Sequence, residues 1–147
     1  MKTRFLPALL AFASLALCGA QAAPRVIEIT ANDQMKFSVA ALEAKVGEEL
    51  KVVLTNQGTL PKEAMGHNWV LLKPGVDVTA FASAAVTAKD TDYVPASMKD
   101  KVAASIKVLG PKQSGDVTFK VDAPGDYTFI CSFPGHYMLM KGTLKVK

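Results

Sequence analysis

The sequence predicts an all-β fold, a sandwich or barrel of short strands with one short helix inserted between them. Three observations predict it. Runs of five or six residues alternate apolar and polar side chains, which is the period of a half-buried strand. Glycine, proline and asparagine separate these runs at short intervals, as turns require. The length of 147 residues suits one ordinary domain, so a single core is expected.

The alternation is clearest in residues 116–121, where Val117, Phe119 and Val121 point to one face of the expected strand. The same reasoning gives strands at residues 25–30, 50–54, 116–121, 126–131 and 142–146, and residues 66–69 are expected at the head of another strand. Regular short strands separated by turns are typical of sandwiches and barrels. Trp69 is expected in the core, and Tyr127 is expected to anchor a corner.

Residues 77–89 differ from the rest because they contain five alanines. Asp77 or Thr79 is placed to cap the N-terminus of a helix. Val86 and Thr87 are β-branched and weaken the helix propensity. The segment predicts a short helix that covers one flank of the strands.

The first 22 residues are expected to be a secretory signal peptide. Lys2 and Arg4 give a positive start, residues 5–17 form an apolar run, and residues 20–22 form a small-residue cleavage site. The run is too short to span a bilayer. We therefore expect export to the periplasm.

Removal of residues 1–22 would leave a single domain, residues 23–147, with 15 basic and 13 acidic side chains. Its lysines are scattered rather than gathered in a stripe with aromatic residues, so nucleic acid is not an expected partner. Nor does this domain contain an uncharged apolar run of 20 residues, so no integral membrane segment is expected in it. A minor alternative is a lipid anchor on Cys18, because residues 15–19 loosely resemble a bacterial lipoprotein signal.

Two motifs contain both histidines and the one cysteine that remains after export. The first, residues 66–69, carries His67, and the second, residues 131–140, carries Cys131, His136 and Met140. A lone thiol in an oxidising compartment is normally lost, paired between chains or occupied. Two imidazoles and a thiolate in one plane, with a weak thioether above them, make a blue-copper electron-transfer site.

Each of these residues has an ordinary alternative role, since a lone cysteine or methionine is usually a core residue. These alternatives would have to hold jointly for all four residues, whereas one metal explains them together. Copper suits the set better than zinc, because a thioether is a poor ligand for zinc. The sequence therefore predicts one copper ion.

The two motifs resemble those of the azurins, a family of cupredoxins. The resemblance extends over the whole expected domain, through residues 32–35, 60–62, 65–70, 131–136 and 140–142. It implies a cupredoxin-like Greek-key β-sandwich or barrel with the inserted helix. It further implies a soluble, monomeric periplasmic electron carrier that cycles one type 1 copper ion between Cu(I) and Cu(II) and is not an enzyme.

The resemblance also implies the roles of individual residues. The implied metal ligands are the carbonyl of Gly66 and the side chains of His67, Cys131, His136 and the axial Met140. Asn68 resembles the residue that ties the two ligand loops together, and Phe133 would shield the thiolate.

The implied partners are redox proteins such as c-type cytochromes or copper or haem reductases. They would dock on a small apolar patch around an exposed edge of His136. The expected patch consists of Met35, Leu60, Met65, Phe133, Gly135 and Leu139. Tyr137 and Met138 replace smaller residues there and are expected to reshape this surface.

Two other functions compete with electron transfer. Copper trafficking is suggested by Met65, Met138 and Met140, but a cage closed across two loops should release its metal slowly. A copper enzyme such as a nitrite reductase needs a second copper centre with its own histidines, and both histidines here are already assigned.

The sequence departs from the azurins at two places. The usual disulfide near the N-terminus is replaced by Arg25 and Gly47, a loss that typically costs about 2–5 kcal/mol. Asn56 stands where some relatives have a histidine linked to pH-dependent behaviour, and we expect that response to be missing.

Overall fold

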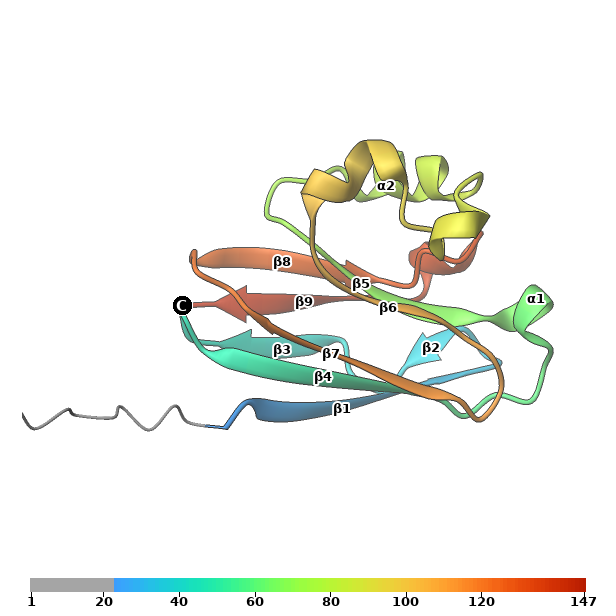
Figure 1. Ribbon diagram of the computed structural model, residues 1–147, viewed down its shortest axis with the longest axis horizontal. Helices are drawn as coiled ribbons and strands as arrows, with labels where there is room; N and C mark the ends of the chain where they lie inside the picture. Colours follow the sequence, from blue (N-terminus) through green and yellow to red (C-terminus); the bar gives the residue numbers. More distant parts are fainter. Residues whose placement is uncertain (1–22) are drawn as a thin grey trace, which may run out of the picture.

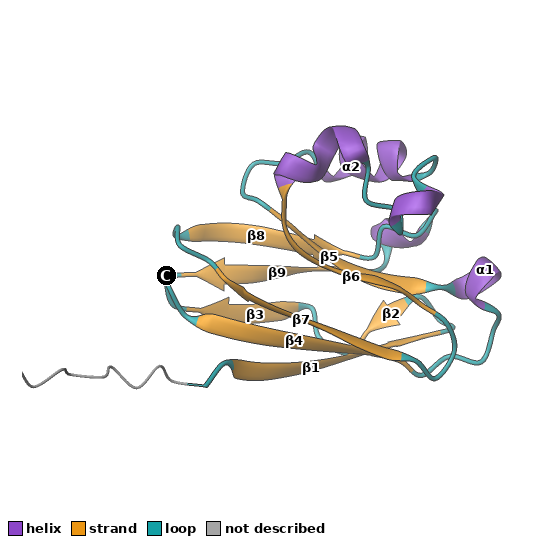
Figure 2. Cartoon of the chain, in the orientation of Figure 1, coloured by secondary structure: helices purple, strands orange, loops and turns teal. Residues whose placement is uncertain are grey.

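A computed structural model describes residues 23–147, and the expected signal peptide lies outside the described residues. The chain forms a sandwich of two β-sheets, with short helices along one side and at one end (Figures 1 and 2). The smaller sheet has the order β2 (Lys36–Phe37), β1 (Arg25–Asn32), β4 (Glu49–Asn56), β7 (Ser114–Lys120). The larger sheet has the order β3 (Ala41–Ala44), β9 (Lys141–Val146), β8 (Gly125–Ile130), β5 (His67–Leu72), β6 (Val102–Leu109). The expected all-β fold is confirmed.

Both sheets are mixed. The first strand pairs in parallel with β4, and β3 pairs in parallel with β9, whereas the other pairings are antiparallel. Strands that are neighbours in a sheet are often distant in the sequence, so the chain crosses repeatedly between the two sheets. This connectivity fits the expected Greek-key sandwich.

The core lies between the sheets, as the alternation predicts. In β4, Leu50, Val52 and Leu54 are at most 1% exposed, and the residues between them are half-buried. Trp69 is fully buried, with its ring centroid 5.9 Å from that of Phe119. The expected core position of this tryptophan is confirmed.

The predicted corner is also confirmed, because the hydroxyl of Tyr127 donates to the carbonyl of Ala123 at 3.0 Å. This hydrogen bond fixes the connection between β7 and β8 to the start of β8. Strand β8 then leads directly into the motif of residues 131–140.

The predicted helix begins where expected but is shorter. Helix α2 spans Val78–Ala85, and the Asp77 carboxylate caps it by accepting from the N–H groups of Thr79 and Ala80. It ends before Val86, where the β-branched pair begins. Two separate 3₁₀ helices follow, η1 (Lys89–Thr91) and η2 (Ala96–Lys101).

Helix α2 explains why β5 is buried on both faces. Phe81 of the helix packs on Val70, Leu72 and Ile130, on the side of the larger sheet that faces away from the sandwich core. Figure 2 shows the helices along this side. The strand that begins with His67 is therefore held rigidly between two packed layers.

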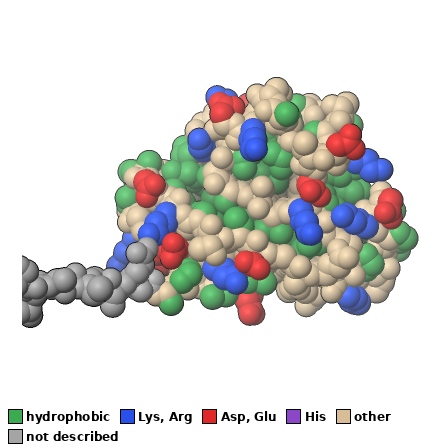
Figure 3. Space-filling view, in the orientation of Figure 1, with side chains coloured by type: hydrophobic (Ala, Val, Ile, Leu, Met, Phe, Trp, Pro, Cys, Tyr) green, Lys and Arg blue, Asp and Glu red, His purple; other side chains and the backbone are tan. Residues whose placement is uncertain are grey.

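Helix α1 (Lys62–Met65) lies at one end of the sandwich, opposite the C-terminus (Figure 1). A further 3₁₀ helix, η3 (His136–Met138), lies in the loop between β8 and β9. Within residues 23–147, no helix has the length and apolar character needed to cross a bilayer. The face drawn in Figure 3 carries basic and acidic side chains interspersed with apolar ones.

Candidate metal centre

The first site loop brings the backbone of Gly66 into a crowded place just before β5. A Cβ added to Gly66 would lie 2.5 Å from Cγ1 of Val108 and 2.6 Å from the carbonyl oxygen of Lys62. Real Cβ atoms do not approach other atoms so closely, so only glycine fits here. His67 follows as the first residue of β5, next to an irregularity in its pairing with β6. The glycine thus lets His67 enter the interior at the end of the sandwich.

The second site loop begins at Cys131, directly after β8, and is closed by its own backbone. The N–H of Cys131 donates to the carbonyl of Met140 at 3.0 Å, and the N–H of Met140 donates to the carbonyl of His136 at 2.8 Å. Gly135 makes the sharp bend with a φ of 83°, a conformation natural to glycine. Backbone bonds therefore fix three of the predicted site residues to one another.

His67, Cys131 and His136 converge as predicted. One possible ligand atom from each lies within 4.8 Å of those from the other two. The Cys131 sulfur is 4.0 Å from Nδ1 of His67 and 3.6 Å from Nδ1 of His136. Nitrogen and sulfur donors at ~2.0–2.3 Å from one ion can lie no more than ~4.4 Å apart. Both sulfur-to-nitrogen distances satisfy this limit, so the three residues fit a single metal ion.

Burial decides the charge of these groups. His67 and Cys131 are completely buried, and His136 exposes only 3% of its surface. Burial raises the pKa of the Cys131 thiol to about 12, although the backbones of Asn68 and Phe133 act in the opposite direction. Burial, with the neighbouring His67, lowers the pKa of His136 to about 4. Burial also lowers the pKa of His67, partly opposed by the backbone of Asn32 and the carboxylate of Asp33.

Two neutral imidazoles are thus ready to donate lone pairs, whereas the thiol must lose its proton before it can bind a metal. A bound cation stabilises the thiolate that burial alone disfavours. Met140, the predicted axial residue, is fully buried, and its backbone contacts both Cys131 and His136. A thiolate, imidazoles and a thioether are a donor set that selects copper.

The expected tie between the two loops is present. The amide of Asn68 donates from Nδ2 to Oγ of Ser132 at 2.8 Å and accepts the N–H of Ser132 at 2.7 Å. Nδ2 also donates to the carbonyl of Asp92 at 2.8 Å. These bonds hold the residues that follow His67 and Cys131 against each other.

Phe133 covers the site from one side. Its ring centroid is 4.7 Å from that of His136 and 5.1 Å from that of Tyr93. Sequence reasoning did not single out Tyr93, because its place depends on the backbone of Asp92 and Tyr93, both left-handed. The only local signal is the Asp92 side chain, which suits such a conformation.

The predicted apolar patch is only partly exposed. Leu60 and Leu139 are 44% and 64% exposed, and Met138 is 67% exposed. Phe133 is buried, and Met35 and Met65 are half-buried. Tyr137 packs against the cluster of Val70, Phe81 and Ile130 under α2. Tyr137 remains half-buried, so Met138 is the more exposed of the two larger residues in this loop.

Residues 25–147 match the family described as copper binding proteins, plastocyanin/azurin family. The chain belongs to this copper-binding family. An azurin of Bordetella pertussis is 45% identical over 125 residues, which cover 82% of each chain. An azurin of Pseudomonas fluorescens biotype A is 40% identical over 126 residues, covering 82% of this chain and 97% of the relative.

Solved structures of the family agree. An azurin from the methylotroph Methylomonas sp. strain J has a TM-score of 0.75 and 34% identity, covering 85% of this chain and 99% of its own. The predicted family and its copper cofactor are therefore confirmed, and the His67, Cys131 and His136 cluster fits one type 1 copper ion. Membership of the plastocyanin/azurin family makes this a copper electron-transfer protein.

Proposed function

We propose that the chain is a periplasmic one-electron carrier that turns over no substrate. Its single copper ion would be held by the side chains of His67, Cys131, His136 and Met140 and by the carbonyl of Gly66. The observation that carries the proposal is the convergence of three buried donors from two loops within 4.8 Å.

Copper supplies a Cu(I)/Cu(II) couple to such a site, and the protein supplies a fixed environment for it. The side chains of Trp69, Phe129 and Phe133, all at most 8% exposed, exclude water from the interior beside the donors. The hydrogen bonds of Asn68 hold the two loops at a constant separation. A rigid, dry site lets an electron enter or leave with little rearrangement of the ligands.

Electrons would pass through the surface beside His136. Its narrow exposed edge lies in a loop that presents Met138 and Leu139, two of the large exposed apolar residues. A small apolar surface favours brief docking and quick release. The partners proposed for it are c-type cytochromes or copper or haem reductases, with the carrier acting as a monomer.

Copper trafficking is the second candidate, and exposed Met138 is the observation that favours it. Trafficking needs a readily exchanged Cu(I), yet His67 and Cys131 are completely buried. Release would require the two loops, joined by the paired bonds of Asn68 and Ser132, to separate. Slow exchange is therefore expected, as a carrier of electrons requires.

Export completes the proposal. Residues 1–22 would direct the chain to the periplasm and be removed there, which leaves Ala23 at the N-terminus. A mass measurement on the native protein distinguishes this cleavage from lipid attachment at Cys18.

The experiment is to add Cu(II) to the refolded apo-protein and record the visible spectrum. An intense blue thiolate-to-copper band is expected, absent in Cys131→Ser and retained in the surface variant Met138→Leu. A pale spectrum in the unmodified protein would overturn the assignment of the site. Rapid transfer of Cu(I) to a soluble chelator, with the blue band intact, would favour trafficking instead.

A further inference from the structure

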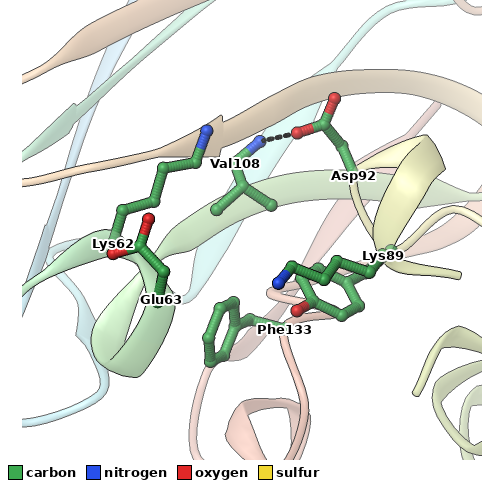
Figure 4. A pocket seen from close by; sticks show the side chains of 7 residues that line it. Lys62, Glu63, Lys89, Asp92, Val108 and Phe133 are labelled. Atoms are coloured by element: carbon green, nitrogen blue, oxygen red, sulfur yellow. Dashed lines mark hydrogen bonds between the residues drawn. The ribbon is translucent and has the colours of Figure 1, made fainter. Parts of the chain in front are cut away.

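A second concave site lies beside the metal centre. It is a cavity of about 230 Å³ between α1, the segment 89–93, β6 and the loop that follows Cys131. Its walls are formed by Lys62 and Glu63, by Lys89, Asp92 and Tyr93, and by Val108 and Phe133. Figure 4 shows Lys62 and Lys89 reaching it from opposite sides. None of the proposed metal ligands lines this cavity, so it is a separate site.

The floor of the cavity is apolar and aromatic. Tyr93 and Phe133 meet edge to face, with their ring centroids 5.1 Å apart, and Val108 lies beside them. An apolar cavity of about 150 Å³ is enough to hold one benzene ring. The space here exceeds that volume, so it can hold a ring together with a small polar substituent.

Two ammonium groups at the rim are free to bind an anion. Within residues 23–147, no hydrogen bond or ion pair engages the ammonium group of Lys62 or Lys89. The lining also contains the carboxylates of Glu63 and Asp92. Asp92 keeps its negative charge, but its Oδ1 already accepts the backbone N–H of Val108 at 3.0 Å. The two ammonium groups thus remain available to a carboxylate that enters between them.

The wall formed by Asp92 and Tyr93 is held in place rather than adaptable. Both residues have a left-handed backbone, with φ values of 53° and 59°. Aspartate tolerates this conformation, whereas for Tyr93 it costs of order 1–3 kcal/mol. The Asn68 amide donates to the Asp92 carbonyl, and the Ser132 hydroxyl donates to the Tyr93 carbonyl at 2.7 Å. Backbone strain that is kept in place by hydrogen bonds from neighbouring segments is found at preformed ligand sites.

We propose that this cavity binds small aromatic carboxylates. The ring would lie against Tyr93 and Phe133, and the carboxylate would sit between the ammonium groups of Lys62 and Lys89. An aromatic ring gains from edge or offset contact with Phe133 and Tyr93, and a carboxylate gains from charge-assisted hydrogen bonds. This binding activity goes beyond the proposed electron transfer and does not depend on it.

A ligand in the cavity should be sensed at the metal centre. Phe133 contacts the cavity on one side, and its ring centroid is 4.7 Å from that of His136. A shift of the Phe133 ring would therefore change the surroundings of His136. Ligand binding should therefore be detectable both at the residues that line the cavity and at His136.

The test is a titration of the Cu(I)-loaded protein with benzoate, followed by NMR. We expect saturable shifts of the Tyr93 and Phe133 ring signals and a smaller shift at His136, whereas benzamide, which is uncharged, should bind more weakly. Lys62→Gln and Lys89→Gln should each weaken benzoate binding by about two- to fivefold, the range of one exposed ion pair. Glu63→Gln should tighten it, because it removes a negative charge from the lining.

The matched control is Lys141→Gln, an exposed lysine outside the cavity, which should leave benzoate binding unchanged. Absence of saturation, or equal affinity for benzoate and benzamide, would overturn the proposal. So would an equal loss in the Lys141→Gln and Lys89→Gln variants, since it would mean non-specific attraction. A missing blue band with intact benzoate binding would instead count against the electron-transfer proposal alone.

Discussion

Asn68 and Ser132 lie 64 positions apart and exchange two hydrogen bonds in the interior. The amide of Asn68 donates to the hydroxyl of Ser132 at 2.8 Å and accepts its backbone N–H at 2.7 Å. The same amide donates to the carbonyl of Asp92. One buried side chain therefore connects the His67 loop, the Cys131 loop and the wall of the neighbouring cavity.

Replacing this asparagine should lower the free energy of unfolding substantially. Asn68→Ala removes three hydrogen bonds and leaves the buried backbone N–H of Ser132 and the partly buried carbonyl of Asp92 without these partners. We expect a loss of about 2–4 kcal/mol, because unsatisfied buried groups cost more than the bonds themselves. Urea unfolding of the apo-protein measures it.

The control for this variant is Thr55→Ala. The hydroxyl of Thr55 makes a hydrogen bond of 2.8 Å with the hydroxyl of Ser114, in an exposed setting. Water can replace that partner, so the expected loss is under about 1 kcal/mol. Equal losses of unfolding free energy in the two variants would show that the Asn68 hydrogen bonds stabilise the protein no more than an exposed hydrogen bond does.

Much of the fold follows from local sequence patterns. Where the sequence failed to predict an element, the local sequence also explains the failure. The strand around Val52 was predicted because apolar and polar residues alternate there. Strand β3 was not predicted, because its sequence of Ala, Leu, Glu and Ala favours helix. It is a strand because it pairs in parallel with β9, a long-range contact that overrides propensity.

The residues of the site likewise divide into those that the sequence predicts and those whose positions depend on long-range contacts. His67, Cys131 and His136 were predicted because their side chains carry rare chemistry in two short motifs. The positions of Asp92 and Tyr93 depend on hydrogen bonds from Asn68 and Ser132, which lie far away in the sequence. The cavity that they line was therefore invisible before the fold was known.

Gly66 should not tolerate even one added methyl group. In Gly66→Ala the new Cβ would lie 2.6 Å from the backbone oxygen of Lys62 and 2.5 Å from Val108. A backbone atom cannot rotate away as a side chain can, so the loop must move. We expect a loss of about 1–3 kcal/mol in unfolding free energy, as in other overpacked sites, and a weaker blue band.

The comparison for Gly66→Ala is Gly110→Ala. There the nearest atom to an added Cβ is Cβ of Lys62 at 3.3 Å, so the two segments need to move apart by only a few tenths of an ångström. Thermal unfolding and the visible spectrum should both change less than in Gly66→Ala. A spectrum that changed in Gly110→Ala but not in Gly66→Ala would contradict the proposed role of the first loop.

An ion pair joins Arg25, at the start of β1, to Glu48, just before β4. Nε of Arg25 donates to the Glu48 carboxylate at 2.6 Å, and Nη2 donates to the carbonyl of Glu43 at 2.6 Å. The pair is partly exposed, so Arg25→Ala should cost less than about 1 kcal/mol. The cost should shrink further in about 1 M salt, where screening extends over only ~3 Å.

The Arg25–Glu48 pair also predicts how stability depends on pH. The hydrogen bond from Arg25, together with the backbone N–H of Lys45, holds the pKa of Glu48 below its ordinary value of 4.5. A carboxylate with a lowered folded pKa stabilises the protein above its unfolded pKa, and this contribution is lost as pH falls through the folded value.

Unfolding midpoints measured from neutral to acidic pH should therefore decline less steeply in Glu48→Gln than in the unmodified protein, specifically below about pH 4.5. Glu28→Gln, which removes an exposed carboxylate in the middle of β1, is the comparison variant. If Glu28→Gln reduced the decline of the unfolding midpoint at acidic pH as much as Glu48→Gln does, the lowered pKa of Glu48 would not be the cause of that decline.

Asn56 is fully buried and hydrogen-bonded. Its amide donates to the carbonyl of Leu109 at 3.2 Å and accepts the N–H of Gly58 at 2.8 Å. An amide does not titrate, so the reduction potential should show no titration from this position near neutral pH. Asn56→His should introduce one, because a protonated imidazole adds positive charge inside the protein and favours the less charged Cu(I) state.

The potential of Asn56→His should therefore rise as the pH falls, whereas that of the unmodified protein and of Asn56→Gln should stay level. Voltammetry across the neutral range measures all three. A steep titration in the unmodified protein would show that another group controls the potential. A level profile in Asn56→His would mean that burial keeps its imidazole neutral throughout, since burial lowers the pKa of histidine, and NMR of that imidazole would identify this cause directly.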